Sequence, residues 1–206
     1  MKVAVVDYGL SNLTCVCAAI ERLGHRGQVA SKPADLNGAE RIILPGVGAF
    51  GDAMANLNTS GMSDALNDKV RDKGTPFLGI CLGAQLVCRD SDEHGHHTGL
   101  GWADAHVRRI EPGDDDLRVP HTGWDDVEAT GESELFADIP DDALFYFTHS
   151  HAIDVNDMDI LRGTCAYGRP FAAALQVGDN IHATQFHPEK SQKYGLAVLG
   201  NFLERC

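Results

Sequence analysis

Residues 76–86 constrain the fold more than any other stretch of this 206-residue chain. They begin as a short apolar run, which is typical of a buried strand in a parallel sheet. Residues 82–89 are expected to form a helix, and Cys81 lies between the two with Gly79 and Gly83 on either side. A strand, a sharp glycine-flanked turn and a helix form a nucleophile elbow, which leaves the side chain at the turn accessible. The alternative is a buried cysteine with a structural role.

Residues 183–191 supply the groups that a nucleophilic cysteine needs. His187 and Glu189 are two residues apart, and in extended backbone such residues project to the same side. Glu189 can therefore hold the imidazole while the imidazole faces the thiol. A thiol, a base and an orienting carboxylate indicate nucleophilic catalysis. We predict Cys81, His187 and Glu189 as the catalytic residues, in preference to a structural cysteine and histidine.

Further motifs accompany these two segments, at residues 5–13, 44–50, 119–124, 145–150 and 185–191. Over nearly its whole length the chain resembles the class I (triad) glutamine amidotransferases. Within that family it is most similar to the glutaminase subunits of imidazole glycerol phosphate synthase, an enzyme of histidine biosynthesis. The resemblance implies hydrolysis of L-glutamine to glutamate and ammonia, with no cofactor or metal. It also implies a tightly associated synthase subunit, expected to be a (β/α)8 barrel, which receives the ammonia.

In this family's chemistry Cys81 would attack the amide carbon, His187 would transfer protons, and Glu189 would orient the imidazole. The backbone N–H of Leu82 follows the nucleophile and is the expected first donor to the oxyanion. By resemblance, the second donor comes from the turn after residue 45, from Val47 or Gly48. We hypothesise that this turn changes its peptide orientation when the partner is engaged. The alternative is a rigid turn that only ends a strand.

The resemblance also assigns residues to the substrate and the partner. Gln85 lies one helical turn after Cys81 and is expected to contact glutamine, together with Gly48, His149 and Ser150. The residues expected to face the synthase and the ammonia passage, each with a structural role as the alternative, are His121, Trp124, Tyr146 and Lys190.

The chain departs from the family pattern near the expected pocket and partner surface. Ser11, Ala84, Thr122, Asp125 and His151 stand where Gly, Met, Met, Asn and Tyr are common. These departures keep open a paralogous glutaminase subunit, whose synthase modifies a nucleotide-linked sugar for surface polysaccharide. A non-catalytic binding protein and a cysteine peptidase of similar architecture are alternatives from other classes. Ammonia release from glutamine would discriminate between them.

The first half of the chain alternates strands with helices, which indicates a parallel sheet with helices on both faces. Strands are expected at 2–6, 28–30, 41–44 and 77–80, and helices at 12–23, 53–57 and 62–73. In the second half, short strands near 105–110, 124–127, 144–148, 172–176 and 181–185 indicate an antiparallel or mixed extension, closed by a helix at 195–203. We expect one domain over residues 1–206, an α/β fold of the flavodoxin-like class I glutamine amidotransferase type.

The composition excludes several partners and sites. A net charge of −13 argues against nucleic acid or an anionic membrane. No apolar run approaches the roughly 20 residues of a membrane helix, so we expect a cytoplasmic protein.

The six cysteines show no metal-like pairing and are expected to be free thiols. His94, His96 and His97 lack a carboxylate or cysteine at ligand spacing, so no metal is expected there. Asp114-Asp115-Asp116 is expected to be a solvated loop.

Overall fold

The computed structural model describes residues 1–111, 113 and 117–206. The acidic segment Asp114-Asp115-Asp116 lies outside the described residues. The helices and short helical turns are α1 (Leu13–Arg22), η1 (Pro33–Leu36), α2 (Phe50–Thr59), α3 (Met62–Leu66), η2 (Asn67–Asp72), α4 (Leu82–Leu86), η3 (Glu134–Phe136), η4 (Met158–Ile160), η5 (Pro188–Lys190) and α5 (Gln192–Glu204). The strands are β1 (Lys2–Val6), β2 (Arg26–Ala30), β3 (Arg41–Gly46), β4 (Phe77–Cys81), β5 (Cys88–Ser91), β6 (His97–Thr98), β7 (Ala103–Arg109), β8 (His121–Asp126), β9 (Glu128–Ala129), β10 (Leu144–His149), β11 (His151–Val155), β12 (Leu161–Cys165), β13 (Phe171–Val177) and β14 (Ile181–Thr184).

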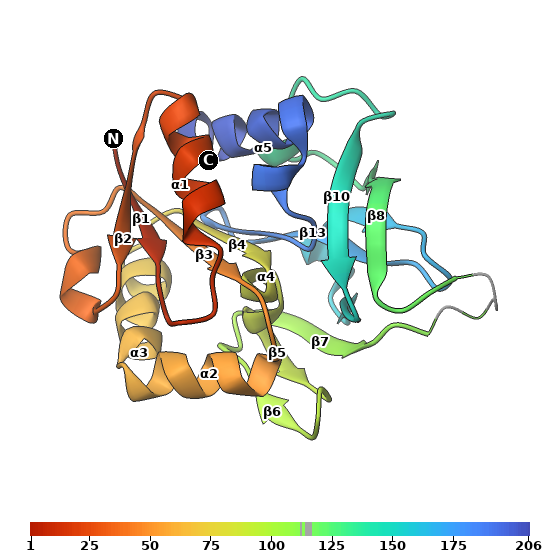
Figure 1. Ribbon diagram of the computed structural model, residues 1–206, viewed down its shortest axis with the longest axis horizontal. Helices are drawn as coiled ribbons and strands as arrows, with labels where there is room; N and C mark the ends of the chain where they lie inside the picture. The colour runs from red at the N-terminus through yellow and green to blue at the C-terminus, as the bar shows by residue number, and fades with distance from the viewer. Residues whose placement is uncertain (112, 114–116) are drawn as a thin grey trace.

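A mixed sheet passes through the middle of the molecule, in the order β2-β1-β3-β4-β14-β13-β11-β7-β5-β6 (Figure 1). Neighbours from β2 to β14 are parallel, and neighbours from β14 to β7 are antiparallel. β12 and β9 extend the sheet beside β13. The prediction of a parallel sheet with an antiparallel extension is therefore confirmed.

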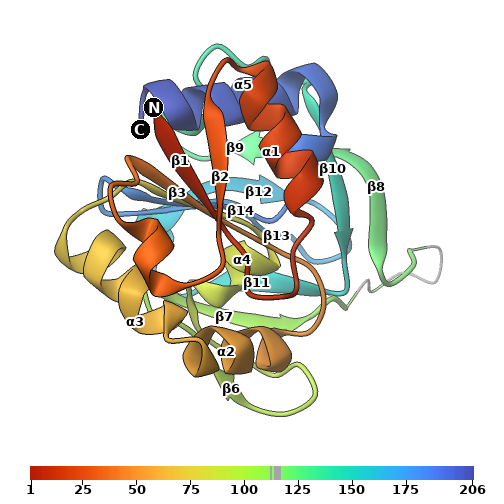
Figure 2. The same ribbon diagram turned by 60° about the vertical axis from the view of Figure 1, so that its left-hand side comes forward.

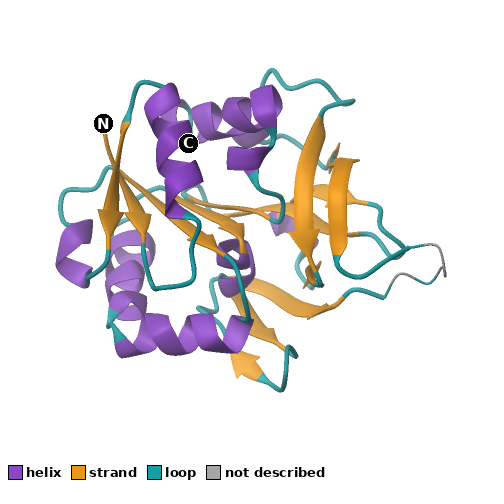
Figure 3. Ribbon diagram, viewed as in Figure 1, coloured by secondary structure: helices purple, strands orange, loops and turns teal. Residues whose placement is uncertain are grey.

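Helices cover both faces of this sheet, as Figures 2 and 3 show. The alternation of side chains along a strand explains why both faces need covering, because successive residues point to opposite sides. In β1, Val3 and Val5 pack into the hydrophobic cluster that includes residues of α1 and α5. Ala4 and Val6 pack into the cluster that includes residues of α2, α3 and α4. Burial on both sides is typical of a central parallel strand.

β8 and β10 form a separate antiparallel ribbon, seen on the right of Figure 1. Its register pairs Tyr146 with Trp124 and His149 with His121. The N–H of His187 donates to the carbonyl oxygen of Tyr146 at 2.9 Å, which fastens the ribbon to the segment after β14.

Some predicted boundaries are wrong. The helix expected at 82–89 ends at Leu86, and Cys88 instead begins β5, which pairs with β7 in parallel at Ala103. The helix expected at 62–73 is α3 followed by the π-helical turn η2. The prediction also omitted β5, β6, β9, β11 and β12. β6 and β9 have only two residues each, and β5 and β11 lack strict alternation of apolar residues. Among the described residues, no helix has both the length and the apolar character needed to cross a bilayer.

The sheet order brings three strand ends together. β4 lies between β3 and β14, and all three run parallel. Gly46 is paired with Cys81, and Thr184 is paired with Ile80. Because ligands in open α/β sheets bind outside the carboxyl ends of parallel strands, this edge is where a site is expected.

Candidate active site

Cys81 occupies the turn between β4 and α4 in a strained backbone conformation, with φ 53° and ψ −108°. Such a conformation in a residue other than glycine is uncommon and often accompanies function. The flanking glycines permit the turn because the backbones approach closely. A Cβ atom on Gly83 would lie 1.7 Å from the carbonyl oxygen of Leu44, and one on Gly79 would lie 2.6 Å from the carbonyl oxygen of Gly83. The expected nucleophile elbow is therefore present.

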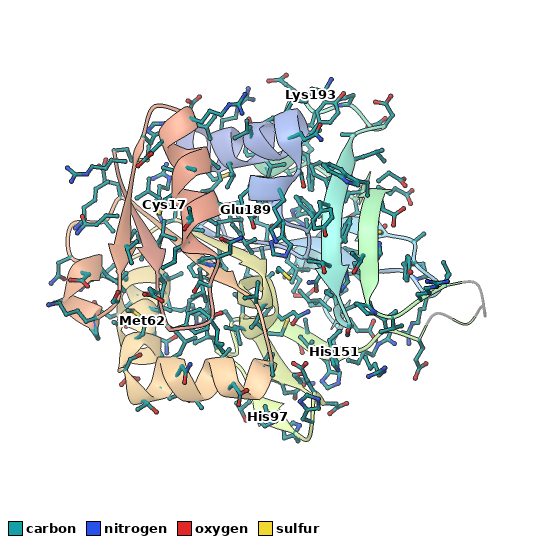
Figure 4. All side chains as sticks on the ribbon, in the orientation of Figure 1. Cys17, Met62, His97, His151, Glu189 and Lys193 are labelled. Atoms are coloured by element: carbon teal, nitrogen blue, oxygen red, sulfur yellow. The ribbon has the colours of Figure 1, made fainter. Side chains whose placement is uncertain are left out.

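His187 and Glu189 are paired as expected. Nδ1 of His187 lies 2.7 Å from Oε1 of Glu189, and both side chains are only 2% exposed. The Ser191 hydroxyl donates to the carbonyl oxygen of His187 at 2.6 Å, which fixes the backbone that carries the imidazole. Glu189 lies beside α1 and the segment that leads into α5 (Figure 4). The contact between Nδ1 of His187 and the Glu189 carboxylate sets the tautomer and orientation of the imidazole ring.

Cys81 also acts on the imidazole of His187. Burial alone would lower the pKa of His187, but the neighbouring Cys81 and Glu189 outweigh burial and raise the pKa to about 9. Among the described residues Nε2 of His187 has no hydrogen-bond partner, which leaves it available to exchange a proton with the thiol. The three residues predicted to act together are thus brought together.

Gln185 also contacts the sulfur, which the sequence analysis missed. Its amide nitrogen lies 3.8 Å from Sγ of Cys81, and the side chain is fully buried. The signal was available, because Gln185 belongs to the same motif as His187. A buried amide at this distance can donate to the sulfur when it is anionic.

A cavity of about 360 Å³ opens in front of Cys81. Its size suits a small polar ligand such as an amino acid. The residues that line it are Val47, Gly48, Cys81, Leu82, Gln85, Glu93, Pro120, Thr148, His149, Ser150 and His151. All the residues predicted for the oxyanion hole and the substrate are in this set. Glu93 was not predicted.

Gln85 and Glu93 form one wall of this cavity. The amide nitrogen of Gln85 donates to the carbonyl oxygen of His151 at 2.8 Å and to Oε1 of Gln185 at 3.0 Å. Both amide protons are thereby used, which leaves the oxygen of Gln85 as an acceptor. Glu93 accepts from the backbone N–H of Phe50 at 2.7 Å and lies 3.3 Å from Nδ1 of His151. The wall therefore presents acceptors and negative charge.

His149 and His121 extend the site beneath the β8–β10 ribbon. Burial lowers the pKa of His149 to about 3, so its imidazole is neutral. Nδ1 of His149 donates to the carbonyl oxygen of His151 at 2.8 Å, and Nε2 lies 3.2 Å from Nδ1 of His121. His121, predicted to face the partner or the ammonia passage, is only 1% exposed, so its side chain lies in the interior.

The two expected oxyanion donors differ in whether their N–H groups are already hydrogen-bonded. Leu82 is the first residue of α4, and its N–H therefore has no partner within the helix. The N–H of Val47 instead donates to the carbonyl oxygen of Leu10 at 2.9 Å. Gly48, the other candidate, has φ +108°, which a side chain would disfavour. In this conformation the Val47 N–H is therefore already hydrogen-bonded and is not free to donate to an oxyanion.

The remaining residues predicted to face the partner lie close together. Trp124 is 41% exposed, and its ring packs edge-on against Tyr146 at 5.8 Å. The ammonium of Lys190 lies 5.8 Å from the centre of the Tyr146 ring. A hollow of about 350 Å³ adjoins Trp124 and Leu144, and Lys193 on its rim is labelled at the top of Figure 4. These exposed aromatic and apolar side chains form a surface that a partner could cover.

Comparison with known proteins identifies the family of the chain. Residues 4–206 match the family described as Glutamine amidotransferase class-I. The chain is 44% identical to the imidazole glycerol phosphate synthase subunit HisH of Moorella thermoacetica, over 98% of this chain and 94% of that protein. It is 43% identical to the HisH subunit of Geobacter sulfurreducens, over 98% of each chain.

Solved structures share the fold at low sequence identity. PurLQS from Thermotoga maritima superimposes with a TM-score of 0.75 at 19% identity, covering 98% of this chain and 97% of that one. A glutamine amidotransferase from the same organism gives 0.70 at 17% identity, covering 100% of this chain and 97% of that one. With the elbow cysteine and the His–Glu pair at one strand edge, and a family match over residues 4–206, the chain belongs to the class-I glutamine amidotransferases.

Proposed function

We propose that this chain is the glutaminase subunit of imidazole glycerol phosphate synthase. It hydrolyses L-glutamine to glutamate and ammonia, and its partner subunit uses the ammonia to form imidazole glycerol phosphate and AICAR in histidine biosynthesis. The observation that carries the proposal is the position of Cys81 at a 360 Å³ cavity, beside the buried pair of His187 and Glu189. The pathway rests on relatives that are 40–44% identical and are named HisH.

The chemistry follows from the geometry. Cys81 gives its proton to Nε2 of His187, and the thiolate attacks the carboxamide carbon of glutamine. His187 then protonates the departing nitrogen, the C–N bond breaks, and ammonia leaves a thioester on Cys81. Water, deprotonated by His187, attacks the thioester carbon. The C–S bond breaks, glutamate leaves and the thiol is restored. Glu189 stabilises the imidazolium that forms in both steps.

Negative charge develops on the carbonyl oxygen of the substrate in both steps, so the hydrogen-bond donors to that oxygen strongly affect kcat. The N–H of Leu82 is one donor. The second is the N–H of Val47, or that of Gly48, after the turn rotates and the hydrogen bond from Val47 to Leu10 breaks. Loss of one oxyanion donor typically lowers kcat by about 10² to 10³. Rotation of this turn on assembly therefore couples glutamine hydrolysis to the presence of the synthase.

The cavity wall suits an amino acid. Glu93 and the oxygen of Gln85 can accept from the α-ammonium group of glutamine. His149, Ser150 and Gly48 also line the cavity. Recognition of the α-amino group by a carboxylate would favour a free amino acid over a peptide. This arrangement therefore supports a glutaminase in preference to a peptidase.

The partner subunit docks on the surface around Trp124, Tyr146 and Lys190. We propose a (β/α)8 barrel synthase that forms a heterodimer with this chain, and a cytoplasmic location for the complex. All six cysteines are free thiols in the structure, which is the usual state in a reducing compartment.

The test measures ammonia release from glutamine by the purified chain, alone and with the host's synthase subunit and its nucleotide substrate. We expect a low rate alone and an increase of about 10² to 10³ in the mixture, as for recovery of one oxyanion donor. Cys81→Ala should abolish glutamine-dependent synthesis and leave synthesis from added ammonium intact, whereas the exposed Cys15→Ala should change neither. No activation by this synthase would argue for the sugar-modifying paralogue, and loss of both activities in Cys81→Ala would contradict the division of labour.

A further inference from the structure

His121, Asp125 and Cys165 form a compact set of potential ligands beneath the β8–β10 ribbon. One ligand atom from each residue lies within 4.8 Å of the other two. His121 and Asp125 belong to β8, and Cys165 ends β12, so the set joins the ribbon to the main sheet. We refer to these three residues as the His–Asp–Cys trio. It lies outside the triad of the proposed glutaminase.

The hydrogen-bond chain that leads into the trio shows which atom of His121 is free. A carbonyl oxygen can only accept, so Nδ1 of His149 carries the proton that it shares with the His151 carbonyl at 2.8 Å. In a ring that carries one proton, Nε2 of His149 is then an acceptor. It accepts from Nδ1 of His121, at 3.2 Å. The proton of a neutral His121 is therefore on Nδ1, and its Nε2 presents a lone pair.

That lone pair faces negative charge. Nε2 of His121 lies 2.7 Å from Oδ2 of Asp125, and the Cys165 sulfur is the third member of the same group. Two acceptors at hydrogen-bond distance require a cation or a shared proton between them. The ring cannot turn easily, because it is stacked between Tyr167, with centroids 3.9 Å apart, and Phe147, at 4.9 Å. The imidazole is thus held with an unprotonated nitrogen aimed into the trio.

We propose that the His–Asp–Cys trio binds a divalent cation of the zinc class, through Nε2 of His121, a carboxylate oxygen of Asp125 and Sγ of Cys165. Imidazole, carboxylate and thiolate are the ligands that Zn²⁺ takes in proteins, and the ligand atoms of a tetrahedral site lie roughly 3–4 Å apart. Donation of the second ring N–H of His121 to another protein group is the usual outer-sphere arrangement of a metal-binding histidine. Binding replaces the thiol proton of Cys165 by the metal and releases that proton to solvent.

The surroundings of the trio allow an ion to enter from solvent and to connect two strands. His121 and Cys165 are 1% and 2% exposed, whereas the side chain of Asp125 is 37% exposed and borders solvent. Water can occupy the fourth position on that side. The bound ion links β8 to β12 and stabilises the ribbon that carries Trp124 and Tyr146. Asp125 stands where the family commonly has Asn, so the carboxylate is a feature of this chain.

No metal was expected from the sequence, because the six cysteines show no metal-like pairing and His94, His96 and His97 lack a further ligand at suitable spacing. Those histidines lie around the β5–β6 turn, and His97 is labelled at the bottom of Figure 4. Within the described parts of the chain, the trio is the one group of at least three His, Cys, Asp or Glu side chains whose ligand atoms are close enough to share an ion. The trio was missed because Cys165 comes to β8 only through the fold.

The experiment uses the untagged full-length chain, stripped with a chelator and carrying Cys81→Ala so that the triad cannot compete for metal. Zn²⁺ is titrated against a chromophoric chelator, and Co²⁺ is added separately to observe a thiolate-to-cobalt charge-transfer band. We expect one equivalent of Zn²⁺ to bind and the cobalt band to appear. Since even outer-sphere changes typically cost 10- to 100-fold in affinity, Asp125→Asn and Cys165→Ser should each weaken binding by about 100-fold. Cys165→Ser should also remove the cobalt band.

Matched variants separate the trio from general effects. Asp126→Asn changes the same charge at the next residue of β8, and Cys88→Ser changes another fully buried cysteine. Both should bind Zn²⁺ as the parent does. Because Asp125→Asn alters a partly exposed side chain without changing its shape, it keeps the test valid even if Cys165→Ser does not fold. Absence of Zn²⁺ binding, which would leave a shared proton between His121 and Asp125, would overturn the proposal. So would binding that neither Asp125→Asn nor Cys165→Ser weakens.

Discussion

The backbone N–H of Val47 donates to the carbonyl oxygen of Leu10 at 2.9 Å, and so it does not point at the position of a substrate oxyanion. Leu10 lies in the loop after β1 and Val47 follows β3, so this bond joins two loops at the carboxyl edge of the sheet. We predict that assembly with the synthase breaks it. The amide signal of Val47 in ¹⁵N–¹H spectra should shift strongly when partner and glutamine analogue are added together.

The control for this prediction is the N–H of Glu40, which donates to the carbonyl oxygen of Lys2 at 2.9 Å at the other end of β1 and should be unaffected. A Val47 signal that stays in place, while glutaminase activity rises with the partner, would show that the turn is rigid.

Glu189→Gln should leave the fold intact and lower kcat for glutamine by at least about 100-fold, since comparable triads lose more. Glu189 helps to hold the pKa of His187 at about 9 against the effect of burial. The imidazolium that protonates the leaving ammonia is therefore present below about pH 9 and is lost above it. With a neutral amide in place of this carboxylate the pKa of His187 falls, so the alkaline limb of the pH–rate profile should move to lower pH. An unchanged kcat with an unchanged alkaline limb would remove Glu189 from the mechanism.

Glu93→Gln should raise the KM for glutamine by about 10-fold or more and leave kcat nearly unchanged, because a hydrogen bond to a charged group contributes about 1.5–3 kcal/mol. The amide oxygen of the substituted side chain could still accept from the N–H of Phe50, so the loop should keep its place. The neighbouring Asp92→Asn, whose side chain is 64% exposed, makes the same charge change outside the cavity lining. Equal effects of the two substitutions on KM would mean that Glu93 acts only through long-range charge.

The sequence predicted the elbow and the His–Glu pair because their geometry is local. Glycines beside Cys81 permit the turn, and a spacing of two residues fixes the relation of His187 to Glu189. Glu93 was missed for the opposite reason. It lies after β5, a strand that was not predicted, and reaches the cavity only because β5 pairs with β7. The bond from Val47 to Leu10 likewise depends on the sheet order, which places β1 beside β3.

The residues proposed to face the partner show why a motif does not predict burial. Trp124 and Tyr146 are directly opposite each other in the β8–β10 ribbon, and both belong to predicted strands. His121 starts the same strand but its ring is buried against Tyr167. A motif identifies such residues as a set, whereas the burial of each depends on what packs against the ribbon. That packing comes from β12 and the following loop, and β12 was not predicted.

His182→Leu should make the protein more resistant to acid. His182 lies on β14, is 1% exposed and faces Phe202 of α5, with ring centroids 6.2 Å apart. Burial is the main cause that lowers its pKa to about 4. In the unfolded chain His182 therefore becomes protonated near pH 6.5, whereas in the folded protein it becomes protonated only near pH 4. The stability that depends on neutral His182 is complete above pH 6.5 and falls as the pH is lowered, by about 3 kcal/mol at pH 4.

Urea unfolding between pH 7 and pH 4 should show a smaller loss of stability for His182→Leu than for the parent. The exposed His96→Leu is the control for removing a histidine. Identical pH dependence in all three proteins would mean that His182 becomes protonated without unfolding, through water that reaches the space between β14 and α5.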